Sequence, residues 1–260
     1  MRRSVNKVAR VPAKLASLES VMDIMWIRDF KWGMRNGIPI ALGYVSVSFT
    51  FGLMAVSAGM SWWQAVLVSM TNLTSAGQFA GLDIMVAGGT LIEMALSQLI
   101  INLRYALMSL SLSQKVDKTV NTLYRFVIGM GITDEIFAVA MSRDRKVSRY
   151  YMFGLIVVPY IGWAGGTFAG AVIGGILPEI VRSALGIAIY GMFLAIIIPK
   201  AREDSAYLKV ILIAVLLSCL FHWVPFLSKV SSGFVIIICA VVASIAGAVL
   251  YPLPEEGDYD

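Results

Sequence analysis

The sequence predicts an all-α polytopic membrane protein with about eight transmembrane segments, some of them broken near the middle of the bilayer. Three observations lead to this prediction. Of the 260 residues, 58% are hydrophobic and only 14% are charged, and the mean hydropathy is +0.80. Such values lie far outside the range of soluble proteins. Several apolar runs of about 17–25 residues are each long enough to cross a hydrocarbon core of about 30 Å.

Eight apolar segments are the expected spans. They cover residues 37–57, 62–81, 90–112, 119–141, 150–173, 183–199, 208–227 and 233–251. The expected organisation is a basic N-terminal tail over residues 1–36, a transmembrane domain over 37–251 and an acidic C-terminal tail over 252–260. An inverted repeat is compatible with this pattern, although inspection of the sequence shows none.

Basic residues set the expected orientation. Eight Lys or Arg lie in residues 1–36, four in 142–149 and three in 200–209. The positive-inside rule places all three segments in the cytoplasm. Eight spans satisfy this rule with both termini cytoplasmic. Lys115 and Lys118 would then lie outside, against the rule.

The N-terminal tail contains an amphipathic pattern. Apolar residues recur there at helical spacing, with most charged residues elsewhere around the helix: Leu15, Leu18, Met22, Met25, Trp26 and Phe30. This pattern predicts a helix lying on the membrane surface. Residues 1–12 lack it and are expected to form a disordered basic tail.

A pair of adjacent carboxylates, Asp134 and Glu135, lies inside the apolar run from Phe126 to Ala140. A carboxylate at the bilayer centre costs about 2.5–3.5 kcal/mol on insertion scales, so two together require a polar cavity, a cation or a proton. Arg104, in the middle of another span, is the expected counter-ion because it cannot lose its own charge. One carboxylate then remains in excess, and it could bind a zwitterion or exchange a proton. The alternative is a buried ion pair that only fixes helix packing.

Two polar segments are expected to interrupt spans. The Ser75–Phe79 stretch should unwind or line a cavity, because irregular backbone survives in a membrane only where protein or water covers it. Gly129 and Gly131 mark a second break. Broken helices at the midplane form the substrate sites of many secondary transporters. The candidate substrate-binding residues are Ser75, Gln78, Phe79, Asn102, Arg104, Thr133, Asp134 and Glu135; Asp134 and Glu135 are also the candidates for proton coupling.

Two further patterns predict structural roles. Gly162, Gly166, Gly170 and Gly174 recur at every fourth position. Such a stripe allows close helix packing, here against another helix of this chain or a partner subunit. Thr90 and Glu93 match a capping box at the start of a span.

Several classes of function are not expected. The sequence has no phosphate-binding loop motif, no cluster with metal-ligand spacing and a single histidine, so no nucleotide hydrolysis, metal, cofactor or enzymatic activity is predicted. Cys219 and Cys239 lie in expected spans, which argues against a disulfide framework. The net charge of +5 is concentrated in the tail and two loops and does not indicate nucleic-acid binding.

Three motifs in a fixed order resemble a known family. They are Ser75-Ala-Gly-Gln-Phe79, Asn102-Leu-Arg-Tyr-Ala-Leu107 and Gly131-Ile-Thr-Asp-Glu-Ile-Phe137. On these motifs the chain resembles, over residues 32–250, the AzlC family, the large subunit of bacterial branched-chain amino-acid exporters. Relatives often have histidine where this chain has Tyr105.

The resemblance implies export of leucine, isoleucine and valine, with methionine as a further candidate, across the bacterial cytoplasmic membrane. It also implies a proton gradient or membrane potential as driving force, and a small AzlD-type membrane subunit as partner. From the residues alone, a polar-lined channel and a structural subunit of a membrane complex remain alternatives. A channel needs no compensated charge cluster, and a structural subunit would not explain Arg104 with the acidic pair.

Overall fold

The computed structural model describes residues 13–252, with side chains from Met25 onward except at several positions of helix α8. The helices are α1 (Ala13–Ser57), α2 (Trp62–Thr71), α3 (Ser75–Val86), α4 (Leu91–Lys115), α5 (Thr122–Met130), α6 (Asp134–Met141), α7 (Arg149–Ile173), α8 (Glu179–Glu203), α9 (Ser205–Trp223) and α10 (Ser232–Leu250), with 3₁₀ turns η1 (Gly174–Ile176) and η2 (Leu227–Lys229). The predicted all-α class is confirmed. Residues 1–12 and the acidic residues of the C-terminal tail lie outside the described part.

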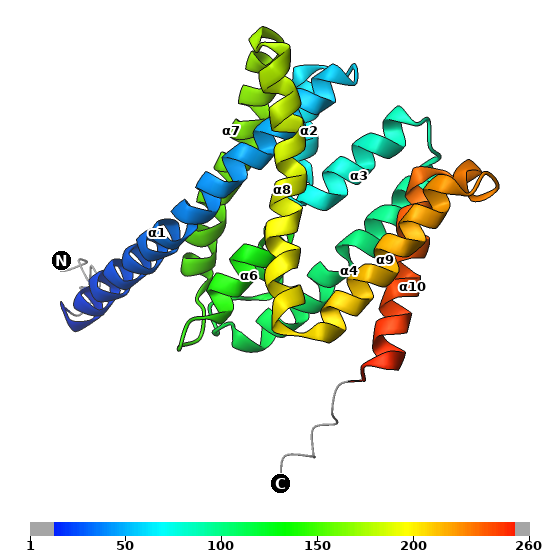
Figure 1. Cartoon of the computed structure of the whole chain (residues 1–260). Helices are drawn as coiled ribbons and strands as arrows, with labels where there is room; N and C mark the ends of the chain where they lie inside the picture. Colours follow the sequence, from blue (N-terminus) through cyan, green and yellow to red (C-terminus); the bar gives the residue numbers. More distant parts are fainter. Residues whose placement is uncertain (1–12, 253–260) are drawn as a thin grey trace, which may run out of the picture.

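Six helices run the height of the bundle. In the described part, α4, α7, α9, α10 and the Met25–Ser57 portion of α1 are long and apolar enough to cross a membrane. Helix α8, with 25 residues, runs alongside them (Figure 1). Helix α1 begins and α10 ends at the same end of the bundle. We call this end the N-terminal face and the other the opposite face.

Helices α2 and α3 form a re-entrant hairpin that enters and leaves at the opposite face. Helix α2 descends beside α7, where the Tyr160 hydroxyl donates to the carbonyl of Met70 (2.9 Å). The chain turns back at residues 72–74, and α3 rises beside α4, where Gln98 Nε2 donates to the carbonyl of Gly77 (2.8 Å). With 10 and 12 residues, each helix has about half the length that a crossing requires.

Helices α5 and α6 form a second re-entrant hairpin, which enters and leaves at the N-terminal face. Val116, just after α4, forms a backbone bridge with Val147, just before α7. The Lys115 ammonium donates to the carbonyl of Met141 at the end of α6. The chain turns back at residues 131–133, between helices of 9 and 8 residues. Both ends of this hairpin are therefore held at one face.

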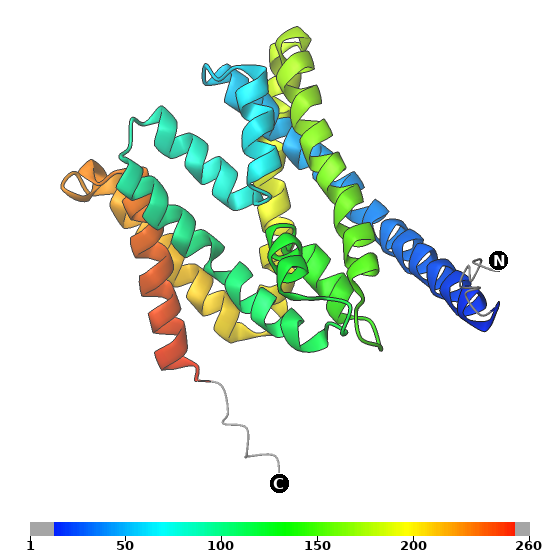
Figure 2. The same ribbon diagram turned by 180° about the vertical axis from the view of Figure 1, so that it is seen from behind.

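The expected count of eight crossings is not confirmed, because segments 62–81 and 119–141 reverse direction instead of crossing. Hydropathy reports how apolar a segment is but not the direction in which it runs. A three-residue turn in the middle of an apolar segment therefore cannot be recognised from hydropathy. Two fewer crossings leave both ends of the described chain at the same face (Figure 2). Lys115 and Lys118 now lie at the same face as the basic segments 142–149 and 200–209, and the exception to the positive-inside rule disappears.

The first two units of the chain are inverted relative to each other. Helix α1 leaves the N-terminal face and is followed by the hairpin α2–α3 from the opposite face. Helix α4 runs the other way and is followed by the hairpin α5–α6 from the N-terminal face (Figures 1 and 2). We call α1–α3 the first unit and α4–α6 the second unit. Their hairpin tips meet near mid-height of the bundle.

Helices α1 and α7 run parallel, with their backbones in close contact. Each glycine of the predicted stripe faces one residue of α1, and these α1 residues also recur at every fourth position. The facing pairs are Gly162 and Ala41, Gly166 and Val45, Gly170 and Phe49, and Gly174 and Leu53. A side chain at these glycines would meet α1 atoms, in the middle of the stripe its backbone. The structure thus places the stripe against a helix of this chain rather than a partner subunit.

Helix α1 is continuous over 45 residues despite the internal Pro39. The expected boundary between an interfacial helix and the first span, at residues 36–37, is not a helix end. At 1.5 Å per residue the helix is about 68 Å long, so it extends beyond the bundle (Figure 1). The side chains of Leu15, Leu18 and Met22 lie outside the described residues, and a surface position for this part of the helix stays a prediction.

Candidate functional site: a charged cluster between two hairpin tips

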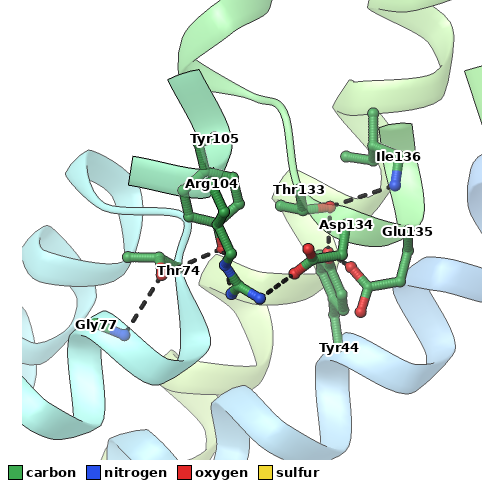
Figure 3. A network of polar contacts seen from close by, with 9 residues as sticks. All are labelled: Tyr44, Thr74, Gly77, Arg104, Tyr105, Thr133, Asp134, Glu135 and Ile136. Carbon is green, nitrogen blue, oxygen red and sulfur yellow. Dashed lines mark hydrogen bonds and ion pairs between the residues drawn. The ribbon is translucent and has the colours of Figure 1, made fainter. Parts of the chain in front are cut away.

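Each hairpin tip ends in a buried threonine that caps the following helix. Thr74 Oγ1 accepts from the amide of Gly77 at the start of α3 (3.4 Å), and Thr133 Oγ1 accepts from the amide of Ile136 at the start of α6 (3.3 Å). Figure 3 shows both caps with the charged residues between them. The two helices therefore direct their N-termini, which carry partial positive charge, toward the middle of the protein.

Arg104 and Asp134 form an ion pair between the two tips. Arg104 Nη1 lies 2.8 Å from Asp134 Oδ2, as the sequence predicts. Arg104 Nη2 also donates to the hydroxyl of Tyr105 (3.1 Å). The Arg104 and Asp134 side chains are 45% and 49% exposed, so neither member of the pair is buried in the described part of the chain.

Glu135 has a different environment from its neighbour Asp134. Its Oε2 lies 2.6 Å from the hydroxyl of Tyr44 on α1, and that hydroxyl lies 2.6 Å from Thr133 Oγ1. Because a phenol carries one proton, Tyr44 donates to the carboxylate and accepts from Thr133. Glu135 forms no ion pair with any residue that the structure describes. Among the described residues, therefore, a cation neutralises Asp134, whereas the partner of Glu135 is a neutral hydroxyl.

Each tip is also bound by a tyrosine from the other unit. Tyr44 of the first unit contacts Thr133 in the second unit. Tyr105 of the second unit donates to Thr74 Oγ1 in the first (3.3 Å). The two hydrogen bonds are equivalent under the inversion of the units but unequal in length (Figure 3). The cluster therefore couples α1, α4 and both hairpins.

The first predicted break lies a few residues earlier than expected. Residues 72–74 are non-helical, whereas Ser75–Phe79 forms the first turns of α3, so this stretch does not unwind. Ser75 lies half-buried at the start of that helix. Thr74 explains why the break ends before Ser75. Threonine is a favoured N-cap residue, and its hydroxyl accepts from the amide of Gly77, so that the helix begins at the next residue, Ser75.

Gln78 and Phe79 are packing residues in the structure. The buried Gln78 amide donates to Ser69 Oγ (2.8 Å) and accepts from Trp163 Nε1 (2.8 Å). It thereby joins α3 to α2 and α7. Phe79 packs edge-on against Phe51, with ring centroids 5.5 Å apart. Neither side chain belongs to the charged cluster, which argues against their predicted contact with substrate.

Asn102 lies one helical turn before Tyr105 on α4 and is incompletely paired. Its Nδ2 donates to Gln98 Oε1 (3.1 Å), while its Oδ1 is buried without a hydrogen-bond partner. A buried acceptor without a partner is rare in folded proteins and marks a group that can take part in binding. Asn102 therefore remains a candidate binding residue.

Glu93 has a structural role that goes beyond the predicted capping box. Thr90 Oγ1 accepts from the Glu93 amide (3.1 Å), as expected of an N-cap. The buried Glu93 carboxylate also accepts from the amide of Gly233 at the start of α10 (2.9 Å). It therefore caps a second helix as well.

Sequence reasoning missed Tyr44. A tyrosine inside a span counts as apolar in hydropathy, and its partner Thr133 is 89 positions away. The sequence feature that could have indicated Tyr44 is the presence of two nearby polar residues, Ser46 and Ser48, in the same apolar segment. That segment also contains glycines that pack against another helix.

Comparison with known proteins identifies the family. A family model described as AzlC protein matches residues 39–177. The chain belongs to the AzlC family. The matched segment includes most of the α1 crossing, both hairpins, α4 and α7, and thus all residues of the charged cluster.

Similar proteins are membrane proteins. An uncharacterized membrane protein of Archaeoglobus fulgidus is 30% identical over 175 residues, covering 66% of this chain and 76% of that protein. The inner membrane protein YgaZ of Escherichia coli is 27% identical over 239 residues, covering 87% and 94%. An uncharacterized membrane protein of Helicobacter pylori is 25% identical over 153 residues, covering 57% and 66%. No solved structure matches the chain.

Proposed function

We propose that this protein is a secondary transporter that exports branched-chain amino acids across the bacterial cytoplasmic membrane, as the large subunit beside a small AzlD-type membrane protein. One observation carries the proposal: two re-entrant hairpins meet with their helix N-termini at a charged cluster that has one carboxylate in excess of its cations. Broken helices that present their termini to a substrate at mid-depth are characteristic of secondary transporters. Membership of the AzlC family supports the same function.

The cluster offers a place for each charge of an amino-acid zwitterion. Helix α3 has no acidic residue in its first turn, so its N-terminus attracts the substrate carboxylate. Helix α6 begins with Asp134 and Glu135, and Glu135 is free to accept the substrate ammonium. Asn102 Oδ1 provides a second acceptor. Because Arg104 is already neutralised by Asp134, its role is to hold the tip rather than to bind the carboxylate alone.

Apolar residues at the second tip select the aliphatic side chain in this proposal. Ile132 is buried just before Thr133, and Phe137 is half-buried one turn later. An apolar pocket distinguishes one methylene group by only about 1–3 kcal/mol. Leucine, isoleucine and valine are therefore expected to be carried with similar preference, and methionine is a further candidate.

Counterflow in proteoliposomes tests the proposal. The protein is purified so that a small partner subunit is retained, and vesicles loaded with unlabelled leucine are diluted into labelled leucine. Transient accumulation of label is expected, because only an alternating-access carrier exchanges one substrate for another. Simple equilibration would indicate a channel, and the absence of uptake with leucine, isoleucine and valine would indicate a structural subunit.

Two single variants test the site. Asp134→Asn and Glu135→Gln should abolish or uncouple transport while the protein still inserts and folds, as judged by monodisperse elution. Asp83→Asn is the matched control, since this carboxylate is exposed on α3, near the opposite face and away from the cluster. Counterflow at the parental rate in both site variants would show that the acidic pair is structural.

A further inference from the structure

We infer that Glu135 is the exchangeable cation site of the proposed transporter and holds a proton and the substrate ammonium in turn. In this division of roles Asp134 and Arg104 stay a fixed pair, and Tyr44 is the residue that positions Glu135. The inference rests on the proposed function and adds to it the coupling ion and the carboxylate that carries it.

The charges of the two neighbouring carboxylates are unequally compensated. Asp134 lies 2.8 Å from Arg104 Nη1, so its charge is balanced in every state that preserves this contact. Glu135 contacts the neutral hydroxyl of Tyr44 and forms no ion pair with a described residue. A second cation is therefore required only at Glu135.

An unbalanced charge at this depth of the bundle is costly. An isolated carboxylate in the hydrocarbon region costs several kcal/mol, so such groups pair or become neutral. The Glu135 side chain is exposed at the start of α6, beside the tip of the second hairpin, so a proton or a ligand can reach it. When the site is empty a proton neutralises it, and when substrate is bound the ammonium does so.

Charge balance at Glu135 then determines the direction in which substrate and proton are exchanged. On the cytoplasmic side the substrate ammonium binds to Glu135, which releases its proton to water on that side. On the outer side the amino acid leaves, and Glu135 takes a proton from the outer water. The amino acid crosses as a neutral zwitterion, so each cycle moves one proton, and one positive charge, inward.

Tyr44 is held in place for this role. Its ring lies edge-on to Trp163 of α7, with centroids 5.1 Å apart, and its hydroxyl lies 2.6 Å from both Glu135 and Thr133. The hydroxyl donates to the ionised carboxylate and can accept from the protonated one. The other charged or titratable groups of the cluster are Asp134 on the same helix and Arg104 and Tyr105 from α4 (Figure 3).

Leucine affinity measured across a pH series tests the inference. With the purified complex, the Kd of the wild type should rise as pH falls, by up to about tenfold per pH unit, because protons compete with the ammonium for Glu135. Glu135→Gln should bind more weakly and without this slope. Glu93→Gln, the same change at a buried carboxylate that caps α10, should keep it.

Two further variants separate the roles. Arg104→Gln combined with Asp134→Asn removes the fixed pair without leaving an unpaired arginine, and the slope should persist. Tyr44→Phe should keep the slope but move its onset to higher pH, because the donor that favours the ionised carboxylate is gone. An unchanged onset would show that Tyr44 does not position Glu135.

The outcomes distinguish the two proposals. Leucine transport with a Kd independent of pH, or a slope that survives in Glu135→Gln, would overturn the inference and leave the proposed function standing. Loss of the slope in the double variant but not in Glu135→Gln would assign the exchange to Asp134 instead. No leucine binding or counterflow in the wild type would overturn both.

Discussion

Replacing Gly166 by alanine tests whether the close contact between α1 and α7 holds the fold together. An added Cβ at this position would clash with Ser48 Oγ and would lie 2.7 Å from the carbonyl oxygen of Val45, both on α1. Ordinary van der Waals contact begins at 3.4 Å, so even with the Ser48 hydroxyl rotated away the two backbones would have to separate by about 0.7 Å here. The neighbouring Gly165 provides a matched control, because a Cβ there meets no atom within 4 Å.

The two variants share one energetic term and differ in the other. Alanine in place of glycine favours a helix by about 0.8–1.0 kcal/mol, and this gain applies to both positions. Overpacking against a neighbouring backbone costs about 1–3 kcal/mol, and this cost applies only to Gly166. The free energies of unfolding should therefore differ by about 1–3 kcal/mol, with Gly165→Ala the more stable variant.

Thermal unfolding in detergent, followed by size-exclusion fluorescence, measures the difference. For chains of this size 1 kcal/mol corresponds to about 2–4 °C in Tm, so the midpoints should differ by roughly 2–12 °C. Counterflow per folded molecule should be similar in both variants. Equal midpoints would refute the packing argument, and a Gly166→Ala variant of normal stability that has lost only leucine binding would assign the stripe to the substrate site.

Three other variants test the packing of Gln78, the cap of α10 and the position of the loop after α4. Gln78→Leu should lower the free energy of unfolding by about 1–3 kcal/mol for each partner it leaves unpaired in denaturation assays, while leucine affinity of the folded fraction stays near the parental value. Glu93→Ala should cost about 0.5–2 kcal/mol through the lost cap of α10; an unchanged midpoint would show that the cap is dispensable. With Cys219 and Cys239 replaced by serine, a cysteine at Lys118 should react with an impermeant maleimide only from the cytoplasmic side. Labelling from outside would show that the segment between α4 and α7 crosses the membrane and does not form a re-entrant hairpin.

Helix positions were largely predictable from the sequence. The expected spans 90–112 and 233–251 correspond to Leu91–Lys115 and Ser232–Leu250, because long apolar runs identify crossings by length alone. The hairpins were not predictable as hairpins, since the segments 62–81 and 119–141 have the length and composition of a crossing. Only the direction of α3 and α6 distinguishes them, and that direction depends on contacts with α4 and α7.

The charged cluster was predictable only in part, for a physical reason. A charge in a membrane must find an opposite charge, so Arg104 and Asp134 could be paired from the sequence. A side-chain amide does not need an opposite charge. From the sequence, Gln78 could equally bind a ligand or join helices, and in the structure it joins α3 to α2 and α7. Tyr44 carries no charge and lies far from Glu135 along the chain, so nothing in its local sequence indicated the contact.

The re-entrant hairpins have a consequence for control of access. A segment that enters and leaves by one face is anchored to the chain only at that face. Displacement of α2–α3 would open the cluster toward the opposite face, and displacement of α5–α6 would open it toward the N-terminal face. In the proposed transporter, entry and exit would thus be governed by separate segments, each held by a tyrosine from the other unit. Loss of the hydrogen bond between Tyr105 and Thr74, or of that between Tyr44 and Thr133, should therefore favour the conformation in which the cluster is open to one side of the membrane. Loss of both should open the cluster to both sides and allow uncoupled flux.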